Sequence, residues 1–193
     1  MKDATYFERV IHGLREAAEK SRLEPDPEGA LRHITHRAQV VLGDPDAGKR
    51  PGGLKPGERD FKVSGIFFVT PRRDQLMLMA EHEFPAEQHR LKISITDSRP
   101  GYTARTGEPV VASNTDDDPM FRQILKTARM GSAVFVPLVW QSEVLGVLNV
   151  AAQARNTYDT KDLEIAILFA NLAAATWIAL DGPNYLAAQV PAS

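Results

Sequence analysis

The side chains that could do chemistry form a few small groups, and cysteine is in none of them. None of the 193 residues is a cysteine, which excludes disulfides, thiolate metal ligands and cysteine nucleophiles together. Three consecutive acids, Asp116 to Asp118, follow Asn114 and could offer oxygen ligands to a hard cation. The run lacks calcium-loop spacing, however, and Asp118 suits the N-cap of a helix over residues 120–128. We therefore expect a helix cap and no metal site here.

Two pairs of histidines are further candidates for a zinc or haem site. His33 and His36 lie three residues apart and could share one face of a helix, while His82 and His89 flank a glutamate-rich turn. Neither pair has a ligand spacing that chance would not supply, so surface histidines are expected. We assign no metal ligand, and the identity of any cofactor stays unknown.

Gly101 and Gly107 bracket a short helical turn whose backbone amides could face an anion, with help from Arg105. The alternative is that both glycines only terminate structure. We find no catalytic triad, phosphate loop or helix-turn-helix motif, and therefore expect no enzymatic activity. An unfamiliar reaction would have to use Asp116, His82 or His89, and no spacing supports it.

Composition describes one globular domain. Hydrophobic residues make up 43% of the chain and charged residues 25%, and the length allows a real core. A net charge of -2 gives no general attraction to nucleic acid or acidic membranes. Charges near the N-terminus break any secretion signal, so we expect a cytoplasmic protein. The apolar run from Leu163 to Leu180 approaches a membrane span in length, but it is alanine-rich, contains Asn171 and lacks a basic anchor.

The elements that position these side chains are clearest in the last third of the chain. Ser132–Trp140 and Val144–Val150 are apolar and rich in β-branched residues, and the three-residue turn between them allows only antiparallel pairing. A long helix should follow, with Asp159 as N-cap, Asp162 at N3 and its end before Gly182. This helix is so apolar that it must bury more than one face.

Upstream, we expect two helices and four strands. The first helix should start at Thr5 with Glu8 completing a capping box, and the second should run from Asp26 to Gly43. The predicted strands cover residues 61–70, 74–80, 91–96 and 110–112. Glycine and proline fill residues 43–60, which we predict to be a surface loop, with partner binding as the alternative.

In this order and spacing the chain resembles the GAF domain, the small-molecule-sensing module of bacterial signalling proteins and cyclic-nucleotide phosphodiesterases. The matching pieces are Ser132, Val136-Pro137-Leu138, Leu145 to Leu148 and Tyr158-x-x-x-Asp162-Leu163, with Gly101 to Val111 and Asp118 to Phe121 upstream. The resemblance covers Asp26 to Leu180. It implies an α+β, GAF/PAS-like profilin-type sandwich with a mostly antiparallel sheet of five or six strands. The N- and C-terminal helices would cover one face, and a crossover over residues 99–130 the other.

The implied domain organisation is an N-terminal helix in residues 1–25, the GAF domain in residues 26–180 and a short tail in residues 181–193. The resemblance also implies a ligand cleft between sheet and crossover. Alternation along the strands would direct four side chains into it, from Ala133, Phe135, Asn149 and Ala151. The crossover would add Tyr102, Arg105, Asn114, Asp116 and Phe121, with Asp117 and Asp118 beside them. Phe135 and Tyr102 would supply apolar walls and Asn149 a hydrogen-bonding handle.

Departures from the family's sequence patterns argue against several activities that other GAF domains have. Relatives that reduce free methionine sulfoxide use cysteines beside carboxylates, on the strands that match Ala133, Asn149 and Ala151. Without thiols that reaction is excluded, as is covalent attachment of a bilin. Relatives that bind cyclic nucleotides carry an Asn-Lys, Phe, Asp-Glu constellation. The corresponding positions in this chain are Ala152, Gln153, Tyr158, Asp162 and Leu163, so half of the constellation is missing.

The function that we expect is therefore sensing of an apolar or anionic small molecule by a cytoplasmic homodimer that acts on a signalling partner. The dimer would form through the terminal helices, where Ala173, Ala174, Ala175 and Ala179 permit close approach and Trp177 offers an anchor. The alternative is an interaction or dimerisation module whose cleft is plugged by its own side chains. Neither nucleic acid nor a membrane is an expected partner.

Overall fold

A computed structural model gives the structure of the protein and describes residues 2–190. Its centre is a six-stranded sheet in the order β3-β2-β1-β6-β5-β4, with all neighbouring strands antiparallel. The strands are β1 Lys62–Val69, β2 Gln75–His82, β3 Lys92–Ser94, β4 Val110–Ala112, β5 Ser132–Trp140 and β6 Glu143–Ala152. The predicted sheet is confirmed, although β3 is shorter than expected.

The hairpin of β5 and β6 supplies two of the inner strands of the sheet, with β6 paired to β1 and β5 to the edge strand β4. Its turn has two residues and not the three that the sequence suggested, because Trp140 pairs with Glu143. Gln141 and Ser142 have positive φ angles of 47° and 69°, as in the type I′ turns whose twist matches that of paired strands. The register then places Phe135 opposite Asn149 and Ala133 opposite Ala151.

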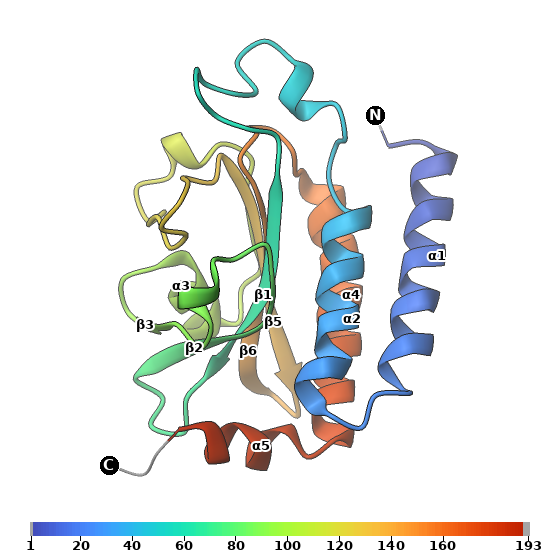
Figure 1. Cartoon of the computed structure of the whole chain (residues 1–193), viewed down its shortest axis with the longest axis vertical. Coiled ribbons are helices and arrows are strands. Elements are labelled where there is room, and N and C mark those ends of the chain that lie inside the picture. Colours follow the sequence, from blue (N-terminus) through green and yellow to red (C-terminus); the bar gives the residue numbers. More distant parts are fainter. Residues whose placement is uncertain (1, 191–193) are drawn as a thin grey trace.

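Three helices lie on one side of the sheet, which we call the helical face: α1 Ala4–Ser21, α2 Pro27–Val41 and α4 Thr160–Ala179. The helices α2 and α4 lie against the strands, and α1 packs on their outer side (Figure 1). The predicted start of α1 is wrong. Its N-cap is Asp3, whose carboxylate accepts the Tyr6 amide at 3.0 Å, so no capping box from Thr5 is needed. The predicted caps of α2 at Asp26 and of α4 at Asp159 are confirmed.

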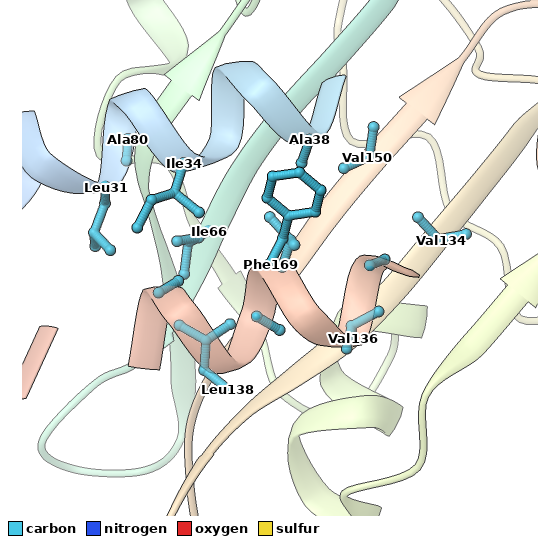
Figure 2. Close-up of a cluster of buried hydrophobic side chains, with 14 of the residues drawn as sticks. Leu31, Ile34, Ala38, Ile66, Ala80, Val134, Val136, Leu138, Val150 and Phe169 are labelled. Carbon is cyan, nitrogen blue, oxygen red and sulfur yellow. The ribbon is translucent and has the colours of Figure 1, made fainter. Parts of the chain in front are cut away.

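The core of the helical face explains the apolar character of α4. Phe169 of α4 meets Ile34 and Ala38 of α2 above the strands (Figure 2), and Trp177 stacks on Phe68 at 4.0 Å between ring centroids. By length and composition α4 could cross a membrane, but its buried residues pack in this core. The second face that α4 had to bury is thus covered by α2.

The opposite face, which we call the crossover face, carries less regular structure. It consists of α3 Arg99–Thr106, the 3-10 helix η3 Thr115–Asp117 and a segment over residues 118–130 without a helix. The predicted helix over residues 120–128 is therefore wrong. The backbone there bonds instead to a distant side chain, because Gln88 donates to the Ile124 carbonyl at 2.8 Å and accepts the Lys126 amide at 2.9 Å.

Residues 43–60, which we call the glycine loop, form an ordered structure at one end of the sheet (Figure 1). They contain the 3-10 helix η1 Ala47–Lys49, in which Ala47 is buried. The loop docks on the connection after β6: the Arg155 amide donates to the Gly53 carbonyl at 2.8 Å, and the Arg59 amide donates to Gln153 at 2.8 Å. The domain's own residues thus hold the loop.

Residues 181–193, expected as a short tail, include a further helix, α5 Gly182–Gln189. The helix crosses the end of the sheet opposite the glycine loop (Figure 1). Its Leu186 is buried, and Tyr185 packs edge-on against Trp177 with ring centroids 6.2 Å apart. Residues 191–193 of the expected tail lie outside the described residues.

Candidate functional site

The four strand residues that were expected in the cleft do lie on the crossover face. Ala133, Phe135 and Ala151 belong to the apolar cluster between the sheet and the 118–130 segment, and Asn149 stands next to Phe135 across the strands. Phe121 joins them from the 118–130 segment and is 8% exposed. Strand alternation after Ser132 is therefore a reliable guide to this surface.

The space beneath the 118–130 segment is nearly filled. A cavity of about 20 Å³ remains, which is room for about one water molecule. Side chains from the sheet, from the segment and from the β2–β3 connection line it: Val63, Phe84, Phe121, Arg122, Ile124, Leu125, Met130, Phe135, Asn149 and Ala151. Phe121, Leu125 and Met130 are buried here, so the cleft is closed by the protein's own apolar side chains.

Asn149 is the polar group that this apolar environment does not explain. Its side chain is 6% exposed, and its Oδ1 is buried without a hydrogen-bond partner. A buried acceptor that lacks a donor costs free energy, on the order of 1–3 kcal/mol. The oxygen therefore offers one unfilled hydrogen-bonding position at the wall of the cavity. The hydroxyl of Thr103 on α3 is likewise buried without a hydrogen-bond partner.

Three of the expected ligand residues are engaged elsewhere. The Tyr102 hydroxyl donates to Glu108, and Arg105 is exposed and donates to the Ile95 carbonyl. Asn114 caps η3, where it accepts the Asp116 amide at 3.2 Å and donates to Asp117 at 2.7 Å. None of the three lines the small cavity. Their side chains hold local turns and do not reach the cleft.

The two glycines around α3 have structural roles. Gly107 ends the helix in the left-handed conformation with φ of 72°, as glycine commonly does at this position. Gly101 lies inside the helix, where a Cβ atom would come within 2.1 Å of the Ile95 carbonyl oxygen. Gly101 is therefore required by close packing, and Gly107 is required by the reversal of the chain at the helix end. Both roles favour the structural interpretation over anion binding.

Asp116 lies outside the cavity, at the centre of an ion-pair network. It contacts Lys55 of the glycine loop at 2.7 Å, Arg129 at 3.3 Å and Arg155 at 3.0 Å. Arg155 also pairs with Glu58, and its side chain is 4% exposed. The hydrogen bond from Lys55, together with Arg155, lowers the pKa of Asp116 to about 2. We call these five residues the Asp116 network.

Asp118 does not act as the cap of a following helix. Its two carboxylate oxygens accept hydrogen bonds from Arg99, each at 2.6 Å. One of them also accepts the Met120 amide at 2.9 Å. The bidentate ion pair fixes the start of the 118–130 segment to α3. This ion pair could not be predicted from the sequence, where the cap pattern alone favoured a helix.

The acids near the histidines form a compact cluster. Glu28, Glu81 and His89 offer ligand atoms that lie within 4.8 Å of one another. Glu28, however, already accepts from Arg32 at 2.9 Å and Arg90 at 2.5 Å. Burial opposes ionisation of Glu28, but the bonds from Arg90 outweigh it, and the pKa of Glu28 lies below its usual value. A cation would have to displace two guanidinium groups, so the cluster is better described as an ion-pair network.

Asp162 holds the terminal helices together. It is fully buried and accepts the Tyr6 hydroxyl at 2.6 Å, the Gly43 amide at 2.8 Å and the Asp159 amide at 3.0 Å. Lys2 pairs with the same carboxylate. Burial and the bond to Asp162 raise the pKa of Tyr6. The sequence predicted Asp162 at position N3 of α4. It did not reveal the partners Tyr6 and Lys2, which lie about 160 residues away in the chain.

Larger hollows lie elsewhere on the surface. One of about 250 Å³ lies between β3 and the 118–130 segment, with Ile93 and Ile124 in its wall, and two others are larger still. One of about 470 Å³ separates the start of α1 from the glycine loop. Several of its charged side chains form ion pairs, as in Lys2 with Asp159 and Arg50 with Asp44. The other, of about 400 Å³, lies beside α5 and has Trp177 in its wall. Both are open grooves, unlike the buried cavity at Asn149.

Comparisons with solved structures agree with this architecture. The GAF domain of a phosphoenolpyruvate-protein phosphotransferase from Coxiella burnetii has a TM-score of 0.74 at 16% identity, over 92% of this chain and 98% of that one. The corresponding GAF domain from Acinetobacter has a TM-score of 0.69 at 15% identity, over 94% and 97%. A free methionine-R-sulfoxide reductase from Neisseria meningitidis, in complex with its substrate, has a TM-score of 0.72 at 16% identity, over 95% and 96%.

At these identities the structural matches establish the fold alone. A comparison with curated protein sequences finds no match. The model of the family described as GAF domain matches residues 54–180, which is more than half of the chain. The six-stranded antiparallel sheet, with helices on one face and a crossover on the other, is the fold that the family resemblance implied. This chain therefore belongs to the GAF domain family.

Proposed function

We propose that this protein is a small-molecule-sensing regulatory module, non-enzymatic and cytoplasmic, that binds its ligand between the sheet and the 118–130 segment. Membership of the GAF family supports a regulatory role in general. The observation that carries the specific proposal is the unpartnered Oδ1 of Asn149, buried beside the cavity. A ligand that donates a hydrogen bond to this oxygen would remove the cost of leaving it unsatisfied.

The chemistry of the walls defines the ligand class. Phe121, Phe135 and Met130 are apolar, and none of the side chains that line the cavity is an acid. We therefore propose a mostly apolar molecule with one hydrogen-bond donor. Pockets for drug-sized ligands measure roughly 300–1,000 Å³, so a ligand has to displace Phe121, Leu125 and Met130 from a space of about 20 Å³. Movement of the 118–130 segment is thus part of binding.

A thermal-shift screen across nucleotides, amino acids, aromatic compounds and oxyanions tests the proposal. A ligand at a hundred times its Kd should stabilise the fold by about 2.7 kcal/mol. The response should be lost in Asn149→Val and kept in Asn114→Ala, because Asn114 caps η3 outside the cavity. No response across the panel, or an equal response in both variants, would contradict binding at Asn149.

A second candidate function is supported by the small volume of the cavity. In it, the cleft is permanently filled and the protein acts as an interaction module. The side-chain amide resonance of Asn149 distinguishes the two. In a sensor its chemical shift moves when a screening hit is added, whereas in a plugged module it is unchanged at saturating concentrations of any compound.

We also propose a homodimer that acts on a signalling partner and forms through the terminal helices, as the sequence suggested, but not through all of the residues named there. Ala173, Ala174 and Trp177 are buried within the fold and cannot meet a second subunit, whereas Ala175 and Ala179 are exposed. The large exposed apolar residues of α1, α2 and α4 are Phe7 (40%), Ile11 (67%), Val40 (49%) and Leu168 (50%), and all but Val40 belong to α1 or α4. Sedimentation should show a dimer at micromolar concentration that dissociates in Ile11→Lys, while Arg15→Ala leaves it intact. A monomer in the unmodified protein would refute this proposal.

A further inference from the structure

The cleft and the glycine loop are physically connected through the Asp116 network. Asp116 belongs to η3, which leads directly into the 118–130 segment. Its partner Lys55 belongs to the glycine loop, and the contact measures 2.7 Å. A side chain that precedes the moving segment by two residues therefore binds an element that lies some sixty residues earlier in the chain.

A second contact runs through Arg155 in the connection after β6. Its Nε donates to Asp116 at 3.0 Å, and its Nη1 pairs with Glu58 of the glycine loop. The Arg155 side chain is only 4% exposed, and its guanidinium bridges the two carboxylates through separate N–H groups. Arg129, near the other end of the 118–130 segment, contacts Asp116 at 3.3 Å.

We propose that the glycine loop is the output of the sensor, released or held according to the position of the 118–130 segment, and that the Asp116 network couples the two. This inference rests on the proposed function, because it names the element that responds when the cleft opens. In the closed state described here, Asp116 is bonded to Lys55 and Arg155. Displacement of Phe121 and Leu125 by a ligand would pull on Asp116 and weaken both contacts.

The coupling can be tested without a ligand. Gln88 bonds to the backbone at Ile124 and Lys126 and is 1% exposed, so Gln88→Ala should loosen the 118–130 segment directly. Hydrogen exchange should then speed up at the Phe121 amide, which donates to Asp118. If the network couples the two elements, exchange should also speed up at the loop amides of Gly53, Glu58 and Arg59.

The expected change at the loop amides is at least about fivefold, the lower end of typical coupling between sites. Glu87→Ala is the matched control, since Glu87 is the exposed neighbour of Gln88, and it should change neither region. In Asp116→Asn the loop should already exchange faster, and adding Gln88→Ala should then accelerate only the 118–130 segment. Asp117→Asn, the adjacent exposed acid, should retain the full coupling.

Lys55→Met provides a second route, because Lys55 is exposed and its loss leaves the core untouched. It should weaken the coupling, but less than Asp116→Asn does, because Arg155 still bridges Asp116 and Glu58. Faster exchange in the 118–130 segment of Gln88→Ala with an unchanged loop would overturn the inference. That result would leave ligand binding at Asn149 unaffected, and failure of the ligand screen would leave the exchange result unaffected, so the two failures are distinguishable.

Discussion

The two faces of the sheet are closed in different ways. On the helical face, the long helices α2 and α4 pack fully buried residues such as Ile34, Phe169 and Trp177 against the strands. On the crossover face, an irregular segment is held by single residues, Gln88 from the β2–β3 connection and Arg99 from α3. The helical face is stabilised by the apolar surface that its helices and strands bury together. On the crossover face, a few specific hydrogen bonds and one ion pair fix the path of the irregular segment. A face of the second kind can open without unfolding the domain.

Cavity-forming substitutions on each face should separate the two most strongly. Phe169→Ala, at a position that is 0% exposed, should destabilise the fold by about 3–5 kcal/mol, because a rigid helical layer cannot fill the space. Leu125→Ala, at 3% exposure, should cost only about 2 kcal/mol, since the 118–130 segment can collapse inward. Urea unfolding measures both. Equal losses would remove the proposed difference in rigidity.

Removal of the Asp162 carboxylate should be the largest polar effect. In Asp162→Ala the Tyr6 hydroxyl and the Gly43 amide would stay buried without an acceptor, so we expect a loss of about 3 kcal/mol. Asp159→Ala, which removes the N-cap and a partly exposed ion pair with Lys2, should cost about 1 kcal/mol. Urea unfolding gives both values, and a smaller loss in Asp162→Ala than in Asp159→Ala would contradict this role.

The Asp116 network should show its contribution through pH. The pKa of Asp116 is lowered from 3.8 to about 2, so the folded state favours the ionised form. The stabilisation is present above pH 3.8 and is lost as the pH falls through 2. At pH 7, Asp116→Asn should lower stability by up to about 1 kcal/mol. Its Tm should converge with that of the unmodified protein at pH 2, whereas a constant difference would show that the ion pairs do not contribute.

The smallest effect is expected at the cleft itself. Asn149→Val removes an oxygen that has no hydrogen-bond partner, so stability should stay within about 1 kcal/mol of the original or increase. Thr35→Val on the helical face is the matched comparison, because its hydroxyl donates to the Ala80 carbonyl at 2.8 Å, and it should be destabilised. If Asn149→Val cost more than Thr35→Val, Asn149 would have a structural partner and not a free position for a ligand.

The sequence predicted the parts of the fold that depend on local patterns. Its β-branched and aromatic composition identified β5 with its exact bounds, and the family resemblance together with strand alternation placed Ala133, Phe135, Asn149 and Ala151 on the crossover face. The cap at Asp159 was also a local pattern. The 118–130 segment could not be predicted, because its backbone bonds to Gln88, which lies 36 residues before Ile124. Arg155 and Lys2 were missed for the same reason: their partners are distant in the chain, and one sequence holds no signal for such pairs.

The candidate site was predicted in part. Strand positions were correct because the sheet fixes them, whereas Tyr102, Arg105 and Asn114 were placed by their proximity to the crossover in sequence. Polar side chains on a connecting segment tend to satisfy their own turn first, as Asn114 does with Asp116 and Asp117. The sequence predicted that these side chains form hydrogen bonds, but it did not predict that they point away from the cavity.

The placement of the two tryptophans has an optical consequence. Trp177 is 1% exposed and stacks on Phe68, while Trp140 at the hairpin tip is 37% exposed. One indole should emit at short wavelength from the interior of the helical layer, and the other at long wavelength from water. Neither belongs to the apolar cluster around Asn149, so native emission reports melting of the helices. An indole introduced as Phe121→Trp would add a colour change for opening of the cleft.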